Sequence, residues 1–241
     1  MLIDIVKKII YREKYNSDTY IEFLRKKGIT IGKDCTIYVP TKTFIDTQYP
    51  FMIKIGDHVK ITLGVIILTH DYSWSVLKNN SSESEGAILG GSGPVNIGNN
   101  VFIGMNAIIC RNVNIGDNVI IGAGSVVVKD CESDSVYAGN PAKKIMSVNQ
   151  FYNKRRASQF KEAKEIFSYY YKKYKKIPSK KIFREYFMLF EDEQSIKKDN
   201  LFYIERNLGL GEKSTFQYMK NNKKSFENYD EFILECLKDN K

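Results

Sequence analysis

Only two histidines, one tryptophan and four cysteines occur among the 241 residues, so few side chains are available as metal ligands or nucleophiles. The cysteines form no CxxC pair and have no spacing typical of a metal site, which predicts reduced thiols and no bound metal. No apolar stretch approaches the ~18 residues that a membrane helix needs. Charged residues interrupt the apolar N-terminus too often for a signal peptide. We therefore expect a cytoplasmic protein.

Acidic residues are also too few to balance the basic ones, 28 against 37, which gives a net charge of +9. The excess lies mainly at the end of the chain, because residues 1–150 have a net charge of +2 and residues 151–241 one of +7. Residues 152–184 hold twelve Lys or Arg and two Glu, interleaved with tyrosines. This segment predicts either a helix with a solvated basic face or a platform for an anionic acceptor, with peripheral contact to a membrane surface. No nucleic-acid-binding module accompanies the charge, so we expect no nucleic acid partner.

The sequence is rich in one feature, a period of six residues. Eleven six-residue blocks begin with Ile or Val, at positions 31, 37, 55, 61, 67, 97, 103, 109, 115, 121 and 127. The fifth residue of each block is small in all blocks but one, where it is Asp71. Six matches neither the helical period of 3.6 nor the strand period of 2. It is typical of a parallel β-helix, in which short strands stack coil upon coil around a filled prism. Cys35 and Cys131 occupy fifth positions and are expected to be inward thiols.

Three regions follow from these patterns. Residues 1–28 predict helices, the second capped by Ser17 or Asp18 and ended by Gly28. Residues 29–147 hold the repeat, which residues 43–54 interrupt and from which residues 73–93 leave as a long loop rich in Ser, Gly and Asn. Residues 148–241 predict a basic helical extension, with apolar residues at helical spacing around Phe160–Tyr174 and again at Phe183–Phe190. A long loop inside a compact repeat is more often functional than incidental.

The two histidines differ in their surroundings. His58 stands where other blocks have Asn100 and Asn118, so we expect it to be a solvated corner residue. His70 stands where the chain leaves the repeat, at the root of the long loop. An imidazole with a pKa near ~6.5 can accept a proton at neutral pH, which makes His70 the candidate general base.

Four features together resemble a known family: the hexads, the segments THDYSW and IGAGSVVVKD, and the closing YAGNPAKKI. They resemble the hexapeptide-repeat acyltransferases, most closely those that O-acetylate bacterial surface polysaccharides. The resemblance covers roughly residues 17–147. It implies a left-handed parallel β-helix, a homotrimer, and acetyl-CoA bound in grooves between subunits. The left hand comes from the resemblance, since it is an exception to the usual right-handed crossover.

Carried over residue by residue, the resemblance implies roles on both sides of the reaction. His70 matches the catalytic base, and Trp74 matches an aromatic residue at the acceptor or cofactor site. Asp46 lies where related enzymes place a polar residue that binds the acceptor or orients the histidine, and Asp71 is another candidate for orienting it. The residues expected to line the coenzyme are Gly104, Met105, Gly122, Ala123, Lys129, Asn140, Pro141 and Lys143.

A coil of three hexads predicts how the coenzyme residues stack. Blocks 61, 103, 121 and 139 should form one column, and blocks 67, 109 and 127 the next. Gly104 and Met105 should then lie beneath Gly122 and Ala123, with Gly139 one coil further. A backbone N–H near Gly104 is expected to stabilise the oxyanion. Lys129 and Lys143 match basic positions near the nucleotide end of CoA, where charge would meet phosphate.

These expectations describe direct transfer of an acetyl group to a sugar hydroxyl of a cell-surface polysaccharide or its precursor. No covalent acyl-enzyme is expected, because neither Cys nor Ser stands beside His70 in a nucleophile arrangement. An antibiotic O-acetyltransferase, an amino-sugar N-acetyltransferase and a catalytically silent scaffold are alternatives. Zinc-dependent hydration of carbon dioxide on the same fold needs three histidines, and this chain has two.

Overall fold

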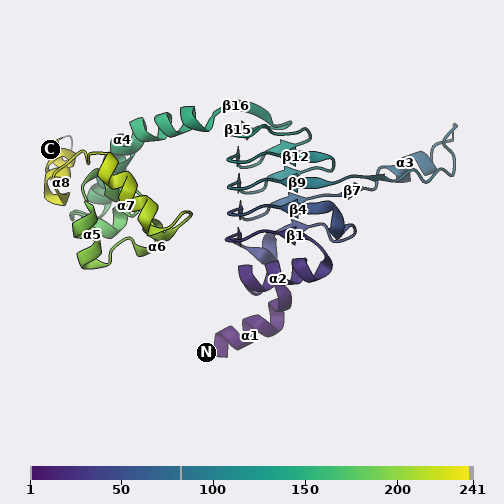
Figure 1. Ribbon diagram of the computed structural model, residues 1–241, viewed down its shortest axis with the longest axis horizontal. Helices are drawn as coiled ribbons and strands as arrows, with labels where there is room; N and C mark the ends of the chain where they lie inside the picture. The colour runs from purple at the N-terminus through teal and green to yellow at the C-terminus, as the bar shows by residue number, and fades with distance from the viewer. Residues whose placement is uncertain (1, 82, 239–241) are drawn as a thin grey trace. The chain divides into compact units, whose positions relative to one another are not determined.

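The computed structural model describes residues 2–81 and 83–238 (Figure 1). The chain forms two compact units, the first ending at Phe151 and the second beginning at Tyr152. The first unit is a left-handed parallel β-helix with helices at its N-terminal end, so the predicted fold class is confirmed. The second unit is helical.

Three parallel sheets form the faces of the prism. The first contains β1 (Thr30–Ile31), β4 (Ile53–Ile55), β9 (Val95–Ile97) and β12 (Val113–Ile115). The second contains β2 (Thr36–Ile37), β5 (Lys60–Ile61), β10 (Phe102–Ile103), β13 (Ile120–Ile121) and β15 (Ser135–Ala138), to which β16 (Lys143–Ser147) adds antiparallel. The third contains β3 (Phe44–Ile45), β6 (Ile66–Ile67), β11 (Ile108–Ile109) and β14 (Val126–Val127).

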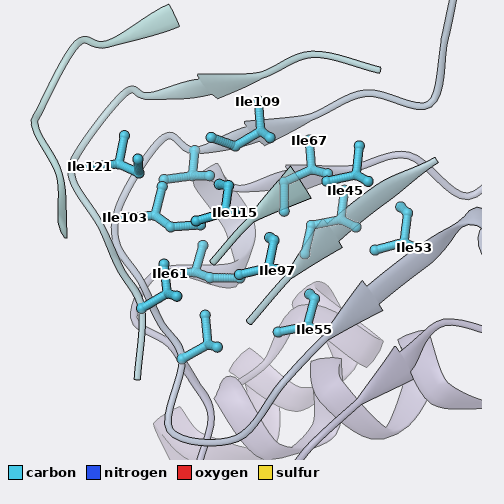
Figure 2. Packing of buried hydrophobic residues seen from close by; sticks show 14 of the residues in the cluster. Ile45, Ile53, Ile55, Ile61, Ile67, Ile97, Ile103, Ile109, Ile115 and Ile121 are labelled. Carbon is cyan, nitrogen blue, oxygen red and sulfur yellow. The ribbon is translucent and has the colours of Figure 1, made fainter. Parts of the chain in front are cut away.

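Isoleucines at the first block positions fill the prism. Ile61, Ile103 and Ile121 stack in register in the second sheet, as the 18-residue period predicts. Ile67, Ile109 and Val127 do the same in the third sheet, and Figure 2 shows the isoleucine side chains converging on the prism interior. Each buried side chain of this size contributes about 1.5–3 kcal/mol of transfer free energy. The stacked columns therefore supply most of the apolar core of this unit.

The corners between sheets require a backbone that glycine and asparagine tolerate. The fourth block positions Asp34, His58, Asn100 and Asn118 all have φ between 53° and 58°, in the left-handed region. Asn and Asp visit this region more readily than other non-glycine residues. His58 is therefore a corner residue, and its Nδ1 lies 3.7 Å from Oδ2 of the exposed Asp34.

The last coil is two residues shorter than the period predicts. Ile121 pairs with Tyr137, and Ile115 pairs with Cys131, so the steps along the chain are 16 residues instead of 18. Cys131 therefore occupies a prism-filling first position, not the expected fifth position, and it is buried. For the same reason the predicted start of the next block at Gly139 was wrong, because Tyr137 and not Gly139 stacks on Ile121.

The first interruption of the repeat adds residues to a coil without breaking it. Within residues 43–54, Ile45 of β3 stacks on Ile67. A 3₁₀ turn at Pro40–Lys42 displaces the expected inward residue Thr41 to the surface, and Thr43 is buried in its place. A second 3₁₀ turn, Pro50–Met52, leads into β4.

The second interruption forms an arm. Its root is a two-stranded antiparallel ladder of β7 (His70–Asp71) and β8 (Gly91–Ser92). The arm carries α3 (Trp74–Lys78) away from the prism (Figure 1).

Helices precede the prism, and α2 (Ser17–Lys27) covers its N-terminal end. Before α2 lie α1 (Leu2–Tyr11) and a 3₁₀ turn (Arg12–Lys14). The cap of α2 is Asn16, which accepts a hydrogen bond from the N–H of Thr19, so the predicted caps Ser17 and Asp18 were one and two residues late. Gly28 ends the helix with φ 108°, as predicted. Ile21 and Leu24 of α2 join the prism core and so close its open end.

The second unit has its own aromatic core. The helices of this unit are α4 (Val148–Tyr174, which starts in the first unit), α5 (Glu193–Asp199), α6 (Tyr203–Asn207), α7 (Glu212–Asn221) and α8 (Tyr229–Leu237). Two 3₁₀ turns, Lys180–Phe183 and Phe187–Leu189, lie between α4 and α5. Ala163 and Phe167 of α4 are fully buried against Phe183, Phe190 and Phe232. The helical spacing at residues 183–190 therefore marks core positions, but they lie in short turns and not in one helix.

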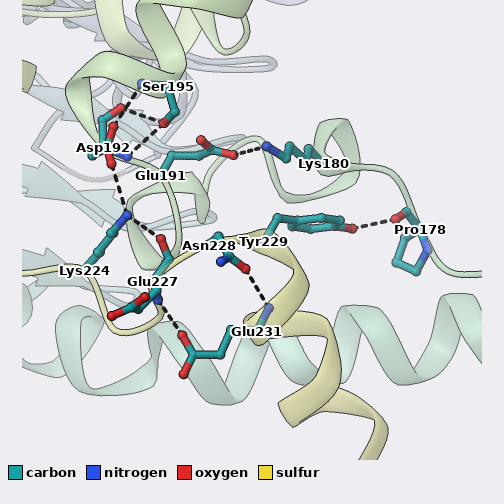
Figure 3. A network of polar contacts seen from close by, with 10 residues as sticks. All are labelled: Pro178, Lys180, Glu191, Asp192, Ser195, Lys224, Glu227, Asn228, Tyr229 and Glu231. Atoms are coloured by element: carbon teal, nitrogen blue, oxygen red, sulfur yellow. Dashed lines mark hydrogen bonds and ion pairs between the residues drawn. The ribbon is translucent and has the colours of Figure 1, made fainter.

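Polar contacts tie the segments of this unit together (Figure 3). Asp192 caps α5, accepting from the N–H of Ser195 at 2.9 Å, and also binds Lys224 at 3.1 Å. Lys180 pairs with the buried Glu191 at 2.7 Å. Tyr229 donates to the carbonyl of Pro178 at 2.5 Å, and burial raises the pKa of its phenol.

Candidate active site

His70 lies where the third sheet ends and the arm begins. It follows Thr69, which is fully buried, and its backbone pairs with Ser92 across the root of the arm. The imidazole is 22% exposed, and its Nδ1 lies 2.6 Å from Oδ2 of Asp46, which is 3% exposed. The ring of Tyr49 stands perpendicular to the imidazole, with 5.9 Å between centroids, and forms one wall beside it. One nitrogen of the ring is thus held by a buried carboxylate, and part of the ring remains open to solvent.

Asp46 reaches His70 from the neighbouring coil. It follows Ile45, which stacks on Ile67, and its N–H donates to the carbonyl of Ile67 at 3.0 Å. Its carboxylate accepts hydrogen bonds from the N–H of Thr69 at 3.0 Å, from the Thr69 hydroxyl, and from the N–H of Gln48 at 2.9 Å. Burial raises the pKa of Asp46, but the hydrogen bonds from Thr69, Gln48 and His70 outweigh it, so the pKa lies below its ordinary value.

The charge on Asp46 determines the tautomer of His70. An ionised carboxylate only accepts hydrogen bonds, so Nδ1 of the imidazole must donate. In the neutral imidazole the lone pair then belongs to Nε2. The arrangement produces a histidine whose free nitrogen can accept a proton.

Asp71, the alternative candidate for orienting His70, points elsewhere. Its carboxylate accepts from Nε of Arg111 at 2.8 Å and from the N–H and hydroxyl of Ser73 at 3.0 and 2.5 Å. Hydrogen bonds from Ser73 and Arg111 lower the pKa of Asp71 to about 2. Asp71 therefore fixes the root of the arm to the prism.

Trp74 belongs to the arm. It is the first residue of α3, and its ring lies 5.0 Å from that of Tyr72, between centroids. The structure therefore places this residue beyond the ladder that begins at His70.

Four of the expected coenzyme residues occupy a different corner of the prism, after the second sheet. Gly104 stacks under Gly122 and Ala123 so closely that a Cβ on Gly104 would lie 2.5 Å from the nitrogen of Ala123. Met105 is 50% exposed, and Ala123 is exposed. The N–H of Gly104 donates to the carbonyl of Ile121 at 2.8 Å, so it is not available as an oxyanion donor.

The remaining expected coenzyme residues lie in the shortened last coil and after it. Lys129 is exposed at the corner that lost two residues. Asn140 and Pro141 form a cis peptide in the turn between β15 and β16, and Lys143 opens β16 with its side chain exposed. Asn140, Pro141, Lys143 and Gly104 follow or flank the second sheet, whereas Lys129 follows β14 of the third sheet, the sheet that His70 also follows. Within one chain the structure therefore brings Asp46 to His70 and places the expected coenzyme residues, except Lys129, around another corner.

Sequence reasoning missed Thr69, Gln48, Tyr49 and Arg111. Thr69 carried the only signal, a hydroxyl directly before the histidine where the chain leaves the repeat. Asp46 lies beneath Thr69 because Ile45 follows Ile37 by eight residues instead of six. The periodicity does not predict this two-residue insertion.

The described residues contain neither a metal-binding cluster nor a membrane-spanning helix. Within residues 2–81 and 83–238 no group of three or more His, Cys, Asp or Glu side chains could hold a metal ion. In the same part of the chain, no helix has the length and apolar content to cross a membrane.

Comparison with known proteins agrees with the repeat architecture. Residues 94–129 match the family model described as bacterial transferase hexapeptide, six repeats. The protein CapG of Staphylococcus aureus is 43% identical over 131 residues, which are 54% of this chain and 73% of that protein. The chain belongs to the hexapeptide-repeat family of bacterial acyltransferases, and the predicted family and enzyme class are confirmed.

Solved structures of this kind include a maltose O-acetyltransferase from Clostridium difficile, 28% identical with a TM-score of 0.37, over 54% of this chain and 75% of that one. A hexapeptide-repeat acetyltransferase from Vibrio cholerae is 21% identical with a TM-score of 0.43, over 60% and 88% of the two chains.

Proposed function

We propose that this chain transfers an acetyl group from acetyl-CoA to a hydroxyl of a sugar, in a cell-surface polysaccharide or its precursor, with His70 as the general base. The observation that carries the proposal is the contact between Nδ1 of His70 and the buried carboxylate of Asp46. The choice of acetyl-CoA and of a carbohydrate acceptor rests on the resemblance of THDYSW, IGAGSVVVKD and YAGNPAKKI to enzymes with those substrates. Acetyl-CoA is an intracellular metabolite, so we place the reaction in the cytoplasm.

The chemistry follows from the tautomer. Nε2 of His70 takes the proton of the acceptor hydroxyl as its oxygen attacks the thioester carbonyl. Collapse of the tetrahedral intermediate breaks the C–S bond, and the imidazolium returns its proton to the leaving thiolate. Asp46 stabilises the imidazolium in between and keeps the ring oriented, as a carboxylate does in other histidine-dependent acyl transfers.

Direct transfer is favoured over an acyl-enzyme because the nearby nucleophiles are engaged or suppressed. The hydroxyl of Thr69 donates to Asp46, and that of Ser73 donates to Asp71. Burial raises the pKa of the Cys110 thiol, which follows β11 of the third sheet. A raised pKa keeps the group as a thiol, which is a poor nucleophile compared with a thiolate.

We further propose that the active site is shared between subunits of a homotrimer. His70 and the column of Gly104 and Gly122 lie around different corners of one prism. A neighbouring prism would bring a second wall to Met105 and Ala123, which are exposed in the single chain. Lys129 and Lys143 would then meet the phosphates of CoA, with Asn140 and Pro141 shaping the closing turn.

An acceptor screen tests the proposal. The chain is incubated with acetyl-CoA and a panel of neutral and acidic oligosaccharides, amino sugars and antibiotics, and free thiol release is followed with and without each acceptor. We expect acceptor-dependent thiol release with an oligosaccharide and O-acetyl ester formation in the product. Amide formation on an amino sugar, transfer only to an antibiotic, or no transfer at all would contradict it.

A further inference from the structure

An open groove lies along one face of α4 in the second unit. Its volume is about 500 Å³, and it is lined by Tyr169, Tyr170, Tyr174 and Tyr186 together with Glu162 and Glu165. We call this the tyrosine groove. Ala163 and Phe167 of the same helix are fully buried in the core of the unit, and Tyr186 packs against that core. Tyr169, Tyr170 and Tyr174 do not belong to this core and are therefore additional to the aromatic residues that hold the helices together.

The tyrosines combine apolar faces with hydroxyl groups at the surface. Tyr169 is 79% exposed and Tyr174 is 50% exposed, and the rings of Tyr170 and Tyr174 lie 4.7 Å apart at 49°. A pyranose ring has the matching character, with an apolar C–H face and polar hydroxyls at its edge. Exposed tyrosines serve such ligands well, because each offers a rigid ring and one hydroxyl at low entropic cost.

The carboxylates of the groove complete this pattern. Glu162 is held by Arg155 at 2.6 Å and accepts from the hydroxyl of Tyr186 at 3.1 Å, so its charge is compensated. Glu165 is exposed, and its carboxylate can accept hydrogen bonds from sugar hydroxyls.

A cluster of lysines adjoins the groove. Lys172, Lys173, Lys175 and Lys176 are exposed, and among the described residues none of the four lies within 4.0 Å of a carboxylate. Lys173 belongs to both features, since it lines the groove and its Nζ lies 5.4 Å from the ring centre of Tyr174.

Other lysines of this unit are placed differently. Lys180, Lys197 and Lys224 pair with Glu191, Glu193 and Asp192. Attraction to the negative C-terminal end of α4 accounts for Lys172 and Lys173, which lie in its last turn. It does not account for Lys175 and Lys176, which follow the helix. Four uncompensated cations within five positions favour an anionic ligand.

We propose that the tyrosine groove and the adjoining lysine cluster bind an oligosaccharide that carries carboxylate groups. Sugar rings lie on Tyr169 and Tyr174, hydroxyls are bound by Glu165 and the phenols, and the carboxylates face the lysines. The inference deepens the proposed function, and rests on it in so far as this oligosaccharide is the acceptor. The helical unit then retains the polymer between transfers, which raises the local concentration of acceptor hydroxyls.

Calorimetry with the full chain tests the groove, using hexamers of galacturonic acid and of sialic acid, with maltohexaose as the uncharged probe. We expect an acidic hexamer to bind and maltohexaose to bind at least about tenfold more weakly. Y169A/Y174A should weaken binding of the acidic hexamer by about tenfold or more, the loss typical of central aromatic contacts. The matched control is Y203A, because Tyr203 is 56% exposed on α6 of the same unit and outside the groove.

The lysines are tested by K172Q/K175Q/K176Q against K213Q/K223Q, two exposed lysines of the same unit. The first variant should weaken binding several-fold and flatten its salt dependence, because exposed charges are screened over ~8–10 Å at physiological salt. The control should do neither. No binding of either acidic hexamer, equal loss in the variants and their controls, or capture by phosphatidylglycerol vesicles in place of the hexamers would overturn the proposal.

The outcome is separable from that of the acetyl transfer. Binding is measured without acetyl-CoA and should be the same in His70→Ala as in the wild type. A chain that binds acidic hexamers but transfers no acetyl group would overturn the proposed function alone. A chain that transfers acetyl groups but binds no hexamer would overturn only this inference.

Discussion

Nδ1 of His70 lies 2.6 Å from Oδ2 of Asp46, although the two residues are 24 positions apart in the chain. The contact exists because the strand of Ile45 stacks on that of Ile67, so each residue leaves its coil at the same corner. The backbone N–H groups of Thr69 and Gln48 hold the carboxylate in place. The stacked backbone of the prism therefore fixes the position of this pair.

Asp46→Asn should lower acetyl transfer by about 100-fold or more, because an amide can hold the wrong tautomer of His70. CoA affinity should change less than a few-fold, since Asp46 lies away from the expected coenzyme residues. The measurement is steady-state transfer together with calorimetric CoA binding. The matched control is Asp34→Asn, which removes the carboxylate facing the other histidine, His58, and should leave transfer unchanged. Equal losses in both variants would contradict the role of Asp46.

The lowered pKa of Asp46 predicts how its contribution to stability depends on pH. A carboxyl group whose folded pKa lies below its unfolded value of ~3.9 stabilises the fold above that pH. The contribution is lost as the pH falls through the folded pKa. Melting temperatures of the wild type and of Asp46→Asn should therefore differ most above pH ~4 and converge in more acidic solution. A difference that grew on acidification would show that the carboxylate is not stabilised as its hydrogen bonds indicate.

The close stacking of coils predicts that Gly98→Ala destabilises the prism. A Cβ at this position would lie 2.5 Å from Oδ1 of Asp117 and 2.7 Å from the carbonyl carbon of Gly116. Overpacking of this kind typically costs about 1–3 kcal/mol. Thermal unfolding measures the loss, and Gly90→Ala is the control, because nothing lies within 4 Å of a Cβ there. A Gly98→Ala variant as stable as the control would mean that the coils separate more easily than the register indicates.

A shared active site predicts complementation between two inactive variants. His70→Ala removes the base, and Ala123→Trp fills the expected path of the coenzyme on the other corner. Co-expressed with different tags, they should form mixed trimers, in each of which one interface of the three carries both intact elements. Transfer activity should reappear in the doubly purified mixture. Recovery would be absent if one subunit held the whole site.

Much of the prism could be predicted, because a repeat of six residues places the first residue of every block inside the prism. The columns of Ile61 and Ile67 were predicted correctly from the 18-residue coil. The prediction failed where coil length changed, at Cys131 and at the block expected to begin at Gly139, since two missing residues leave the local pattern of Ile and Val intact.

The site was harder to predict than the fold. His70 was recognisable because the chain leaves the repeat directly after it. The choice between Asp46 and Asp71 as its partner depended on insertion lengths, which decide the corner at which each carboxylate emerges. Phe183 and Phe190 were recognised as apolar residues at helical spacing and are core residues, but their turns could not be distinguished from a helix by spacing alone.

The most direct test of the account compares His70→Ala with His58→Ala in acetyl transfer to the best acceptor of the screen. We predict that His70→Ala lowers transfer by at least ~100-fold, the span typical of a lost general base, while CoA affinity stays within a few-fold. His58→Ala should retain nearly full transfer, because His58 is a corner residue of the prism. Full transfer by His70→Ala, or equal losses in both variants, would contradict the assignment of His70 as the base.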